Sequence, residues 1–179
     1  LSLSCILLMT AIGCKTKSEE PKEEETVDLT PKVELAYKIE AQLGEGPIWN
    51  AKTQELYWVD ILSNQLHIFS PEDNENRTLE VPSPIGTVVP FTSRQAVVAL
   101  EDGVYKINLS SGDLQLLSDV EADMPGNRLN DGKCDPAGNF WVGSMNYPQN
   151  EATGNVYKIE PDGKTTKMID SVTISNGIV

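Results

Sequence analysis

Two short segments combine glycine with a side chain whose oxygen can bind a hard metal ion. Glu45 lies within Gly44–Pro47, where glycine lets the backbone pass close to a ligand and proline restricts the chain that follows. Asn176 lies within Ser175–Gly177, and its amide oxygen is a neutral donor of the kind that Ca²⁺ and Mg²⁺ accept. Each segment taken alone is also compatible with a plain turn, so neither establishes a metal site.

A third segment, residues 126–138, is dense in arginine, asparagine and aspartate. In an extended chain, alternation places Arg128 and Asn130 on one face and Leu129 and Asp131 on the other. A guanidinium beside a carboxamide can hold an oxygen-rich ligand through directed hydrogen bonds. The alternative for this segment is a polar loop built on Asx turns.

Composition excludes several classes of function. The chain has 27 acidic and 14 basic residues and a formal charge of −13, which argues against nucleic acid or anionic lipid as a partner. His67 is the only histidine and stands in a hydrophobic run away from the three polar segments, which indicates a structural role. With no other histidine and no suitably placed serine, a Ser-His-Asp mechanism has no support.

The elements that must position these residues are short β-strands. Apolar runs rich in Val, Ile, Tyr and Trp alternate with turn residues, and no stretch shows a sustained helical period. Trp58, Val98 and Trp141 recur at similar places, and a Val-Tyr-Lys-Ile run begins at both Val104 and Val156. A repeat of about 40–50 residues made of short antiparallel strands favours propeller blades over a β-sandwich. Residues 35–179 are expected to supply about three blades.

The first 34 residues are predicted to be a targeting segment rather than part of the fold. Residues 1–13 form a short apolar stretch, typical of a signal peptide, and Cys14 follows small residues as in a bacterial lipobox. Residues 14–34 are highly charged and predict a disordered acidic tether. The sequence therefore predicts lipidation at Cys14 and an exported cell-envelope lipoprotein, in the periplasm or at the outer membrane. An ordinary signal peptide or a buried strand is the alternative.

Together and in this order, the motifs G-E-G-P-x-W, N-R-x-N-D-G-K-x-D-P-x-G and S-N-G resemble the gluconolactonase/regucalcin family of six-bladed β-propellers. The resemblance runs from about Leu43 to Val179. It implies an all-β fold of which this chain is roughly the N-terminal half, since the sequence reads as a piece of a longer protein.

The resemblance also implies roles for single residues. Glu45 and Asn176 match positions that bind the divalent metal, with calcium expected and zinc or magnesium as alternatives. Arg128 and Asn130 match positions that contact the substrate, and in some relatives the latter lies at the metal. Asp131 and its two successors are expected to shape a turn. The catalytic base is expected to be an aspartate downstream of residue 179.

The implied activity is metal-dependent hydrolysis of small lactones, by polarisation of the carbonyl and attack of an activated water. One departure leaves the substrate open, because the acidic residue that usually follows the G-[ST]-M segment is replaced here by the run Asn146–Gln149. The alternatives are a hydrolase of phosphotriesters or other lactones on the same site, and a non-catalytic, lipid-anchored metal-binding propeller. No nucleic-acid partner is expected, and the membrane is a partner only through Cys14.

Overall fold

The computed structural model describes residues 31–179, and the expected signal segment with Cys14 lies outside the described residues. The chain divides into two units, of which the second, Leu35–Val179, contains all twelve strands. Among the described residues there is no helix, and none therefore that is long and apolar enough to cross a membrane. The expectation of an all-β fold is confirmed for this part of the chain.

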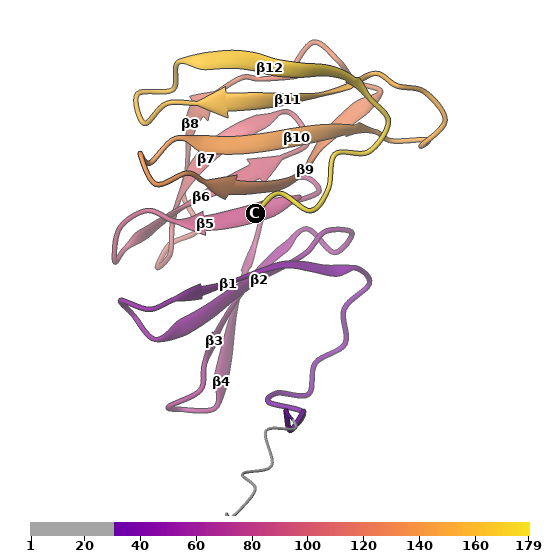
Figure 1. Cartoon of the computed structure of the whole chain (residues 1–179). Coiled ribbons are helices and arrows are strands. Elements are labelled where there is room, and N and C mark those ends of the chain that lie inside the picture. Colours follow the sequence, from indigo (N-terminus) through magenta and orange to yellow (C-terminus); the bar gives the residue numbers. More distant parts are fainter. Residues whose placement is uncertain (1–30) are drawn as a thin grey trace, which may run out of the picture. The chain divides into compact units, whose positions relative to one another are not determined.

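The strands form three four-stranded antiparallel sheets, each built from strands consecutive in the sequence (Figure 1). The first sheet contains β1 (Gly44–Asn50), β2 (Glu55–Asp60), β3 (Gln65–Ser70) and β4 (Glu75–Glu80). The second contains β5 (Thr87–Pro90), β6 (Gln95–Leu100), β7 (Gly103–Asn108) and β8 (Leu114–Ser118). The third contains β9 (Asn127–Cys134), β10 (Phe140–Asn146), β11 (Gly154–Ile159) and β12 (Thr165–Val172).

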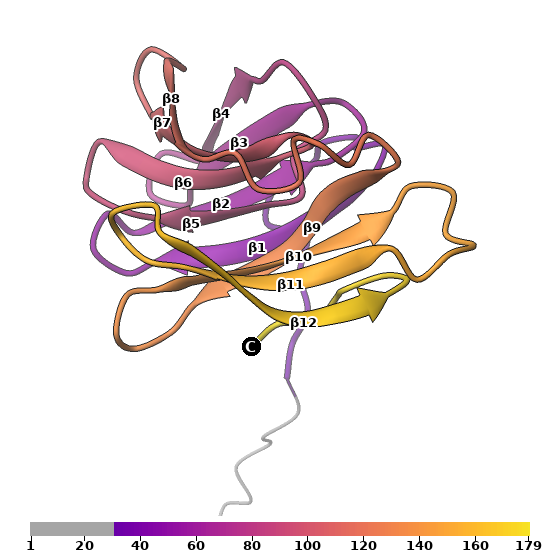
Figure 2. The same cartoon turned by 90° about the horizontal axis from the view of Figure 1, so that it is seen from above.

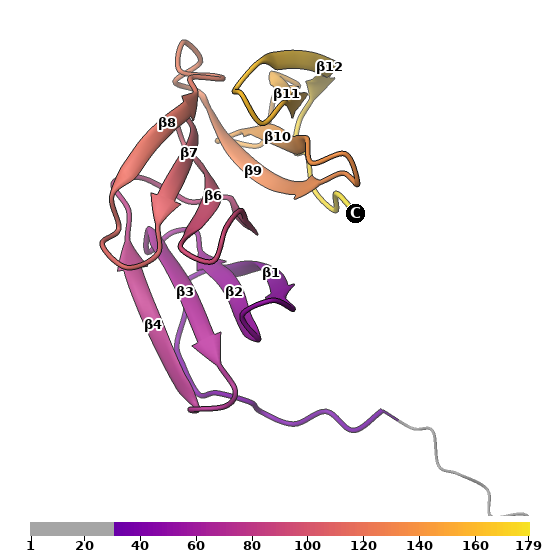
Figure 3. The same cartoon turned by 90° about the vertical axis from the view of Figure 1, so that its left-hand side faces the viewer.

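The first strands of the three sheets lie together, since β5 contacts β1 on one side and β9 on the other. Figure 3 shows the first sheet running outward from β1 to β4 and the third from β9 to β12, and Figure 2 shows the sheets from above. After the outermost strand of each sheet the chain turns back toward the inner strands, through residues 81–86, 119–126 and 173–179. We call these three segments the returns.

The second sheet is buried on both faces because it separates two hydrophobic cores. Along β6, Ala96, Val98 and Leu100 pack toward the first sheet, whereas Val97 and Ala99 pack toward the third. Strict alternation of side chains explains why adjacent residues belong to different cores. It also explains why β6 reads as a continuous apolar run rather than as alternating polar and apolar residues.

The sequence repeat corresponds to equivalent strands in the three sheets. The two Val-Tyr-Lys-Ile runs are β7 and β11, and the preceding β-rich runs are β2, β6 and β10. Register corrects one of the proposed equivalences: Val98 pairs with Tyr105, and the residue that pairs with Tyr157 is Val142 rather than Trp141. Trp141 therefore lies one residue before the true equivalent of Val98, because sequence similarity alone does not determine the register.

Candidate metal and substrate site

One cavity of about 140 Å³ is lined by all four residues expected to bind metal or substrate. Glu45 comes from β1, Arg128 and Asn130 come from β9, and Asn176 comes from the third return. Glu45 and Asn176 are exposed, whereas Arg128 and Asn130 are buried. Glu45 and Asn176, which are 131 positions apart in the sequence, thus line the same cavity. Their roles as metal ligands stay predictions.

Glu45 is held in place by the chain on either side of it. Asp60 at the end of β2 is 1% exposed, and its carboxylate accepts hydrogen bonds from the backbone N–H groups of Gln42 and Leu43, both at 2.9 Å. Burial raises the pKa of Asp60, but these hydrogen bonds together with those from Ser63 outweigh it and leave the pKa below its ordinary value. After Glu45 the strand bulges: Gly46 and Pro47 stand opposite the single residue Trp58.

The bulge in β1 explains the Gly-Glu-Gly-Pro sequence. Gly46 has a φ of +57°, a left-handed conformation that glycine adopts without steric cost. Pro47, which has no N–H, is tolerated at such an irregularity of the ladder. Bulges re-aim side chains next to functional sites. This one separates Glu45, which lines the cavity, from the regular pairing that resumes at Ile48.

A second bulge lies in β9 and overturns one prediction. Asn130 and Asp131 stand opposite the single residue Gly143 of β10, because Leu129 pairs with Ser144 and Gly132 pairs with Val142. Leu129 is buried in the core as expected, but Asp131 lines the cavity together with Asn130 instead of facing away from it. Nor does Asp131 shape a turn, since it lies within a strand. The extra residue shifts the alternation by one.

Asp131 also ties the third return to β9. Its carboxylate accepts a hydrogen bond from the backbone N–H of Ile178 at 2.8 Å, and the Asn130 amide donates to the carbonyl of Ser175 at 2.8 Å. Figure 1 shows this return, in yellow, running from β12 back to the side of β9. The two contacts bracket Asn176, whose own amide oxygen accepts from the N–H of Gly177 at 3.0 Å.

Arg128 is the buried cation of the cavity. Its Nη1 donates to the carbonyl of Leu129 at 3.1 Å and to the amide oxygen of Asn130 at 2.8 Å, and its guanidinium lies over the Tyr147 ring, 5.8 Å from the centroid. Burial lowers the pKa of Arg128, and interactions with Tyr147 and Glu101 oppose that shift. Two fixed hydrogen bonds and an aromatic ring orient the guanidinium before any ligand arrives.

The donor chemistry of the cavity fits a hard cation in part. Glu45 supplies a carboxylate to which no group among residues 31–179 donates a hydrogen bond, and Asn176 and Asn130 add amide oxygens. Ca²⁺ takes six to eight such oxygens. Within the described part of the chain, no three His, Cys, Asp or Glu residues are grouped to hold a metal. Any ion here would therefore use amide oxygens as well.

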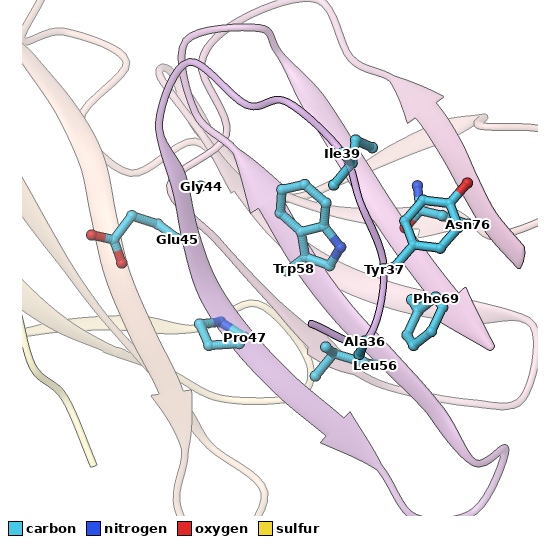
Figure 4. Close-up of a pocket in the computed structure, with 10 residues that line it drawn as sticks. All are labelled: Ala36, Tyr37, Ile39, Gly44, Glu45, Pro47, Leu56, Trp58, Phe69 and Asn76. Carbon is cyan, nitrogen blue, oxygen red and sulfur yellow. The ribbon is translucent and has the colours of Figure 1, made fainter. Parts of the chain in front are cut away.

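A second cavity, of about 300 Å³, lies on the other side of β1 and has a different character (Figure 4). Its lining is mainly apolar and aromatic, with Tyr37, Trp58 and Phe69 prominent. Figure 4 shows the Glu45 carboxylate turned away from these rings. The Trp58 ring stacks on His67 at 3.9 Å between centroids.

His67 has a structural environment and contributes nothing to the polar cavity. It is 2% exposed, and burial lowers its pKa. Its Nδ1 lies 3.0 Å from the Asn76 amide nitrogen and 3.1 Å from the Thr78 hydroxyl. A buried neutral imidazole packed on an aromatic ring agrees with the role expected from its hydrophobic surroundings in the sequence.

Three residues at or near the cavity were missed by sequence reasoning. They are Tyr147 and Gln149, which belong to the loop after β10, and the buried carboxylate Glu121 of the second return. Gln149 lines the cavity and has a φ of +61°, unusual for a residue with a side chain. The departure from the family pattern at Asn146–Gln149 pointed to this loop, but no sequence signal indicated Glu121.

Comparisons with known proteins bear on the family and the fold of this chain. Residues 43–179 match the family model described as the SMP-30/Gluconolactonase/LRE-like region. The chain is 32% identical over 136 residues to 6-deoxy-6-sulfogluconolactonase of Pseudomonas putida, covering 76% of this chain and 47% of that protein. It is 32% identical over 152 residues to regucalcin of Xenopus laevis, covering 82% and 51%.

A solved structure is similar as well. A calcium-binding protein, regucalcin, from Agrobacterium tumefaciens superposes with a TM-score of 0.74 at 27% identity, covering 78% of this chain and 47% of that one. The chain thus spans about half the length of the relatives it matches.

Proposed function

Because the chain belongs to the SMP-30/gluconolactonase/LRE-like family, we propose that the whole protein is a metal-dependent hydrolase that opens small lactones. The observation that carries the proposal is the single cavity lined by Glu45, Arg128, Asn130 and Asn176. The proposal includes a ring of six blades, of which the three sheets described above are half. It also includes export as a cell-envelope lipoprotein anchored through Cys14.

Glu45 and Asn176 are proposed to hold the divalent cation. Their oxygens are hard donors, which favours calcium, with magnesium or zinc as alternatives. The regucalcin of Agrobacterium tumefaciens, described as calcium-binding, supports the choice. A cation bound there supplies Lewis acidity at a carbonyl oxygen. The chain leaves the Glu45 carboxylate exposed, so that a cation can reach it.

Arg128 and Asn130 are proposed to orient the substrate. Arg128 keeps its positive charge in a buried site, and Nη1 is already committed to Leu129 and Asn130, so the guanidinium presents its other N–H groups in a fixed direction. Donors fixed in advance stabilise developing negative charge on a carbonyl oxygen without reorganising during the reaction. The general base is proposed to be an aspartate from the rest of the protein.

The proposal is tested on the full-length protein with a panel of sugar lactones. We expect excess EDTA to abolish turnover and calcium, magnesium or zinc to restore it to different extents. Glu45→Gln keeps the size of the side chain but removes the charge, so activity should fall by about 100-fold or more, the scale at which loss of one key electrostatic group is felt. Glu72→Gln, at an exposed turn remote from the cavity, is the matched control. Full activity in excess EDTA contradicts the proposal.

The same assay separates the two alternative functions. Turnover of phosphotriesters but not of lactones, still sensitive to EDTA and Glu45→Gln, assigns another substrate to the same site. A rise in melting temperature with metal but no turnover of any ester indicates a binding protein in which the metal only stabilises the fold.

A further inference from the structure

Glu121 is a buried carboxylate that lies outside the cavity and has no cationic partner among residues 31–179. It is 6% exposed, and its oxygens accept three hydrogen bonds from neutral donors: Asn127 Nδ2 at 2.7 Å, Asn155 Nδ2 at 2.6 Å and the Tyr157 hydroxyl at 2.6 Å. Its φ of +67° is left-handed, which disfavours any residue with a side chain. Carboxylates are seldom buried without a paired charge, so this position is costly to maintain.

The hydrogen bonds that end at Glu121 all run in one direction. The Asn146 amide donates to the Thr153 hydroxyl at 3.2 Å, Thr153 donates to the Asn127 amide oxygen at 2.6 Å, and Asn127 donates to Glu121. An ionised carboxylate only accepts, whereas amides and hydroxyls can do both. We call this series from Asn146 through Thr153 and Asn127 to Glu121 the relay. Glu121 and the Thr153 carbonyl, which accepts from the same Asn127 NH₂ group at 3.0 Å, together set the orientation of the Asn127 amide and, through it, that of the Thr153 hydroxyl.

The far end of the relay holds the loop beside the cavity. The Asn146 amide oxygen accepts from the backbone N–H groups of Asn150 and Glu151, at 3.1 and 3.2 Å. Between these positions the loop carries Tyr147, which lies under the Arg128 guanidinium, and Gln149, which lines the cavity. The near end is equally close to the site, because Asn127 immediately precedes Arg128.

We propose that Glu121 is a positioning residue for the substrate side of the cavity. Through Asn127, Thr153 and Asn146 it fixes both the start of β9, with Arg128, and the loop that carries Tyr147 and Gln149. The claim that this arrangement serves substrate binding rests on the proposed function. The claim that Glu121 orders the loop does not.

Replacing Glu121 by glutamine shows how the relay would fail. A glutamine oxygen in place of Oε1 keeps the bonds from Asn155 and Tyr157, but its NH₂ group then faces the NH₂ group of Asn127. The opposite orientation of the glutamine places its NH₂ group against that of Asn155, so one of the two asparagine amides must turn over. If the Asn127 amide turns over, its bond to the Thr153 carbonyl is lost as well. The turned amide presents NH₂ to Thr153, so the Thr153 hydroxyl loses its acceptor and the bond from Asn146 is disturbed in turn.

The experiment compares three variants of the full-length protein. Glu121→Gln replaces the acceptor of the Asn127 amide by a group that also donates. Thr153→Val removes the hydroxyl that links Asn146 to Asn127. Tyr157→Phe is the matched control, because it removes a bond of nearly the same length to Glu121, 2.6 Å against 2.7 Å from Asn127, that does not lead to the loop. Hydrogen exchange at the amides of Asn150 and Glu151 reports loop order. KM and kcat for a lactone, with product binding by calorimetry, report the cavity.

We expect Glu121→Gln and Thr153→Val each to speed exchange of the two amides by about 10-fold, the effect of losing one hydrogen bond's worth of stabilisation. KM should rise by a similar factor while kcat stays within about 2-fold, since Glu45 and Asn176 are untouched. Tyr157→Phe should leave exchange and KM near the wild-type values.

Unchanged exchange in Glu121→Gln overturns the proposal, as does an equal effect from Tyr157→Phe, which would mark Glu121 as a general link between strands. Altered exchange with an unchanged KM overturns the link to substrate binding. If the wild-type protein hydrolyses no lactone, the proposed function fails, and the exchange measurements still decide whether Glu121 orders the loop.

Discussion

Replacing Gly86, which lines the cavity, by alanine should damage the site by pushing against the backbone of β9 at Leu129 and Asn130. Gly86 ends the first return, where the chain passes close to β9. A Cβ at this position would lie 2.4 Å from the carbonyl oxygen of Asn130 and 2.5 Å from that of Leu129. Both distances fall about 1 Å short of ordinary contact, and the obstructing atoms are backbone, so β9 or the return must move.

The size of the effect follows from that displacement. Overpacking of this kind costs about 1–3 kcal/mol, which lowers the melting temperature by about 2–4 °C per kcal/mol in a protein of this size. The carbonyl of Leu129 accepts the Arg128 hydrogen bond, so the shift also disturbs the guanidinium. We expect KM for the lactone to rise by about 10-fold, the equivalent of one lost hydrogen bond.

Thermal unfolding and steady-state kinetics of the full-length protein measure both effects. The matched control is Gly126→Ala, because a Cβ at Gly126 meets no atom within 4 Å. That variant should stay within about 0.5 kcal/mol of wild type. If Gly86→Ala melts and turns over like Gly126→Ala, the close approach of the first return to β9 is wrong.

Three further predictions concern the Arg128 guanidinium, the pKa of Asp135 and attachment of the protein to membranes. Arg128→Lys keeps a cation but loses the planar guanidinium, whose Nη1 bonds both Leu129 and Asn130 and whose other nitrogens are proposed to bind substrate, so KM should rise by about 10-fold or more in steady-state assays. Hydrogen bonds from Trp141 and Asn139 lower the pKa of Asp135 to about 2, so its stabilising contribution is complete above its ordinary pKa and is lost as pH falls toward 2. A carboxyl ¹³C titration should show that midpoint, and one near 4 would contradict it. Cys14→Ser should release the full-length protein from membranes in cell fractionation, whereas equal membrane retention argues against lipidation.

The strands were predictable because their signals are local. The β-rich composition of each run is a property of five to eight neighbouring residues, and these runs became β2, β6, β7, β10 and β11. The same holds for the turn residues between them. Assembly into consecutive four-stranded sheets also followed from the repeat, because each strand pairs with its neighbour in sequence.

The features that the sequence did not predict arise where the geometry depends on distant parts of the chain. A bulge in β9 brought Asp131 into the cavity, and no local pattern distinguishes Asn-Asp-Gly in a bulge from the same residues in a turn. Glu121 bonds residues 34 and 36 positions away, Asn155 and Tyr157, so its role exists only once β9 and β11 are in place. The grouping of Glu45 and Asn176 was inferred from a family resemblance, not from their spacing.

Each of the three returns contributes a residue at or near the cavity, although Glu45, Arg128 and Asn130 lie on strands. Gly86 ends the first, Glu121 belongs to the second and Asn176 belongs to the third, while the two cores are formed mainly by the strands. The first two returns also carry core residues, since Val81 and Ile85 of the first and Val120 of the second are buried, so the sheets tolerate a change in a return only where it spares such positions. The third return, which contributes no residue to either core, is therefore the segment to exchange between homologues when a new specificity is sought.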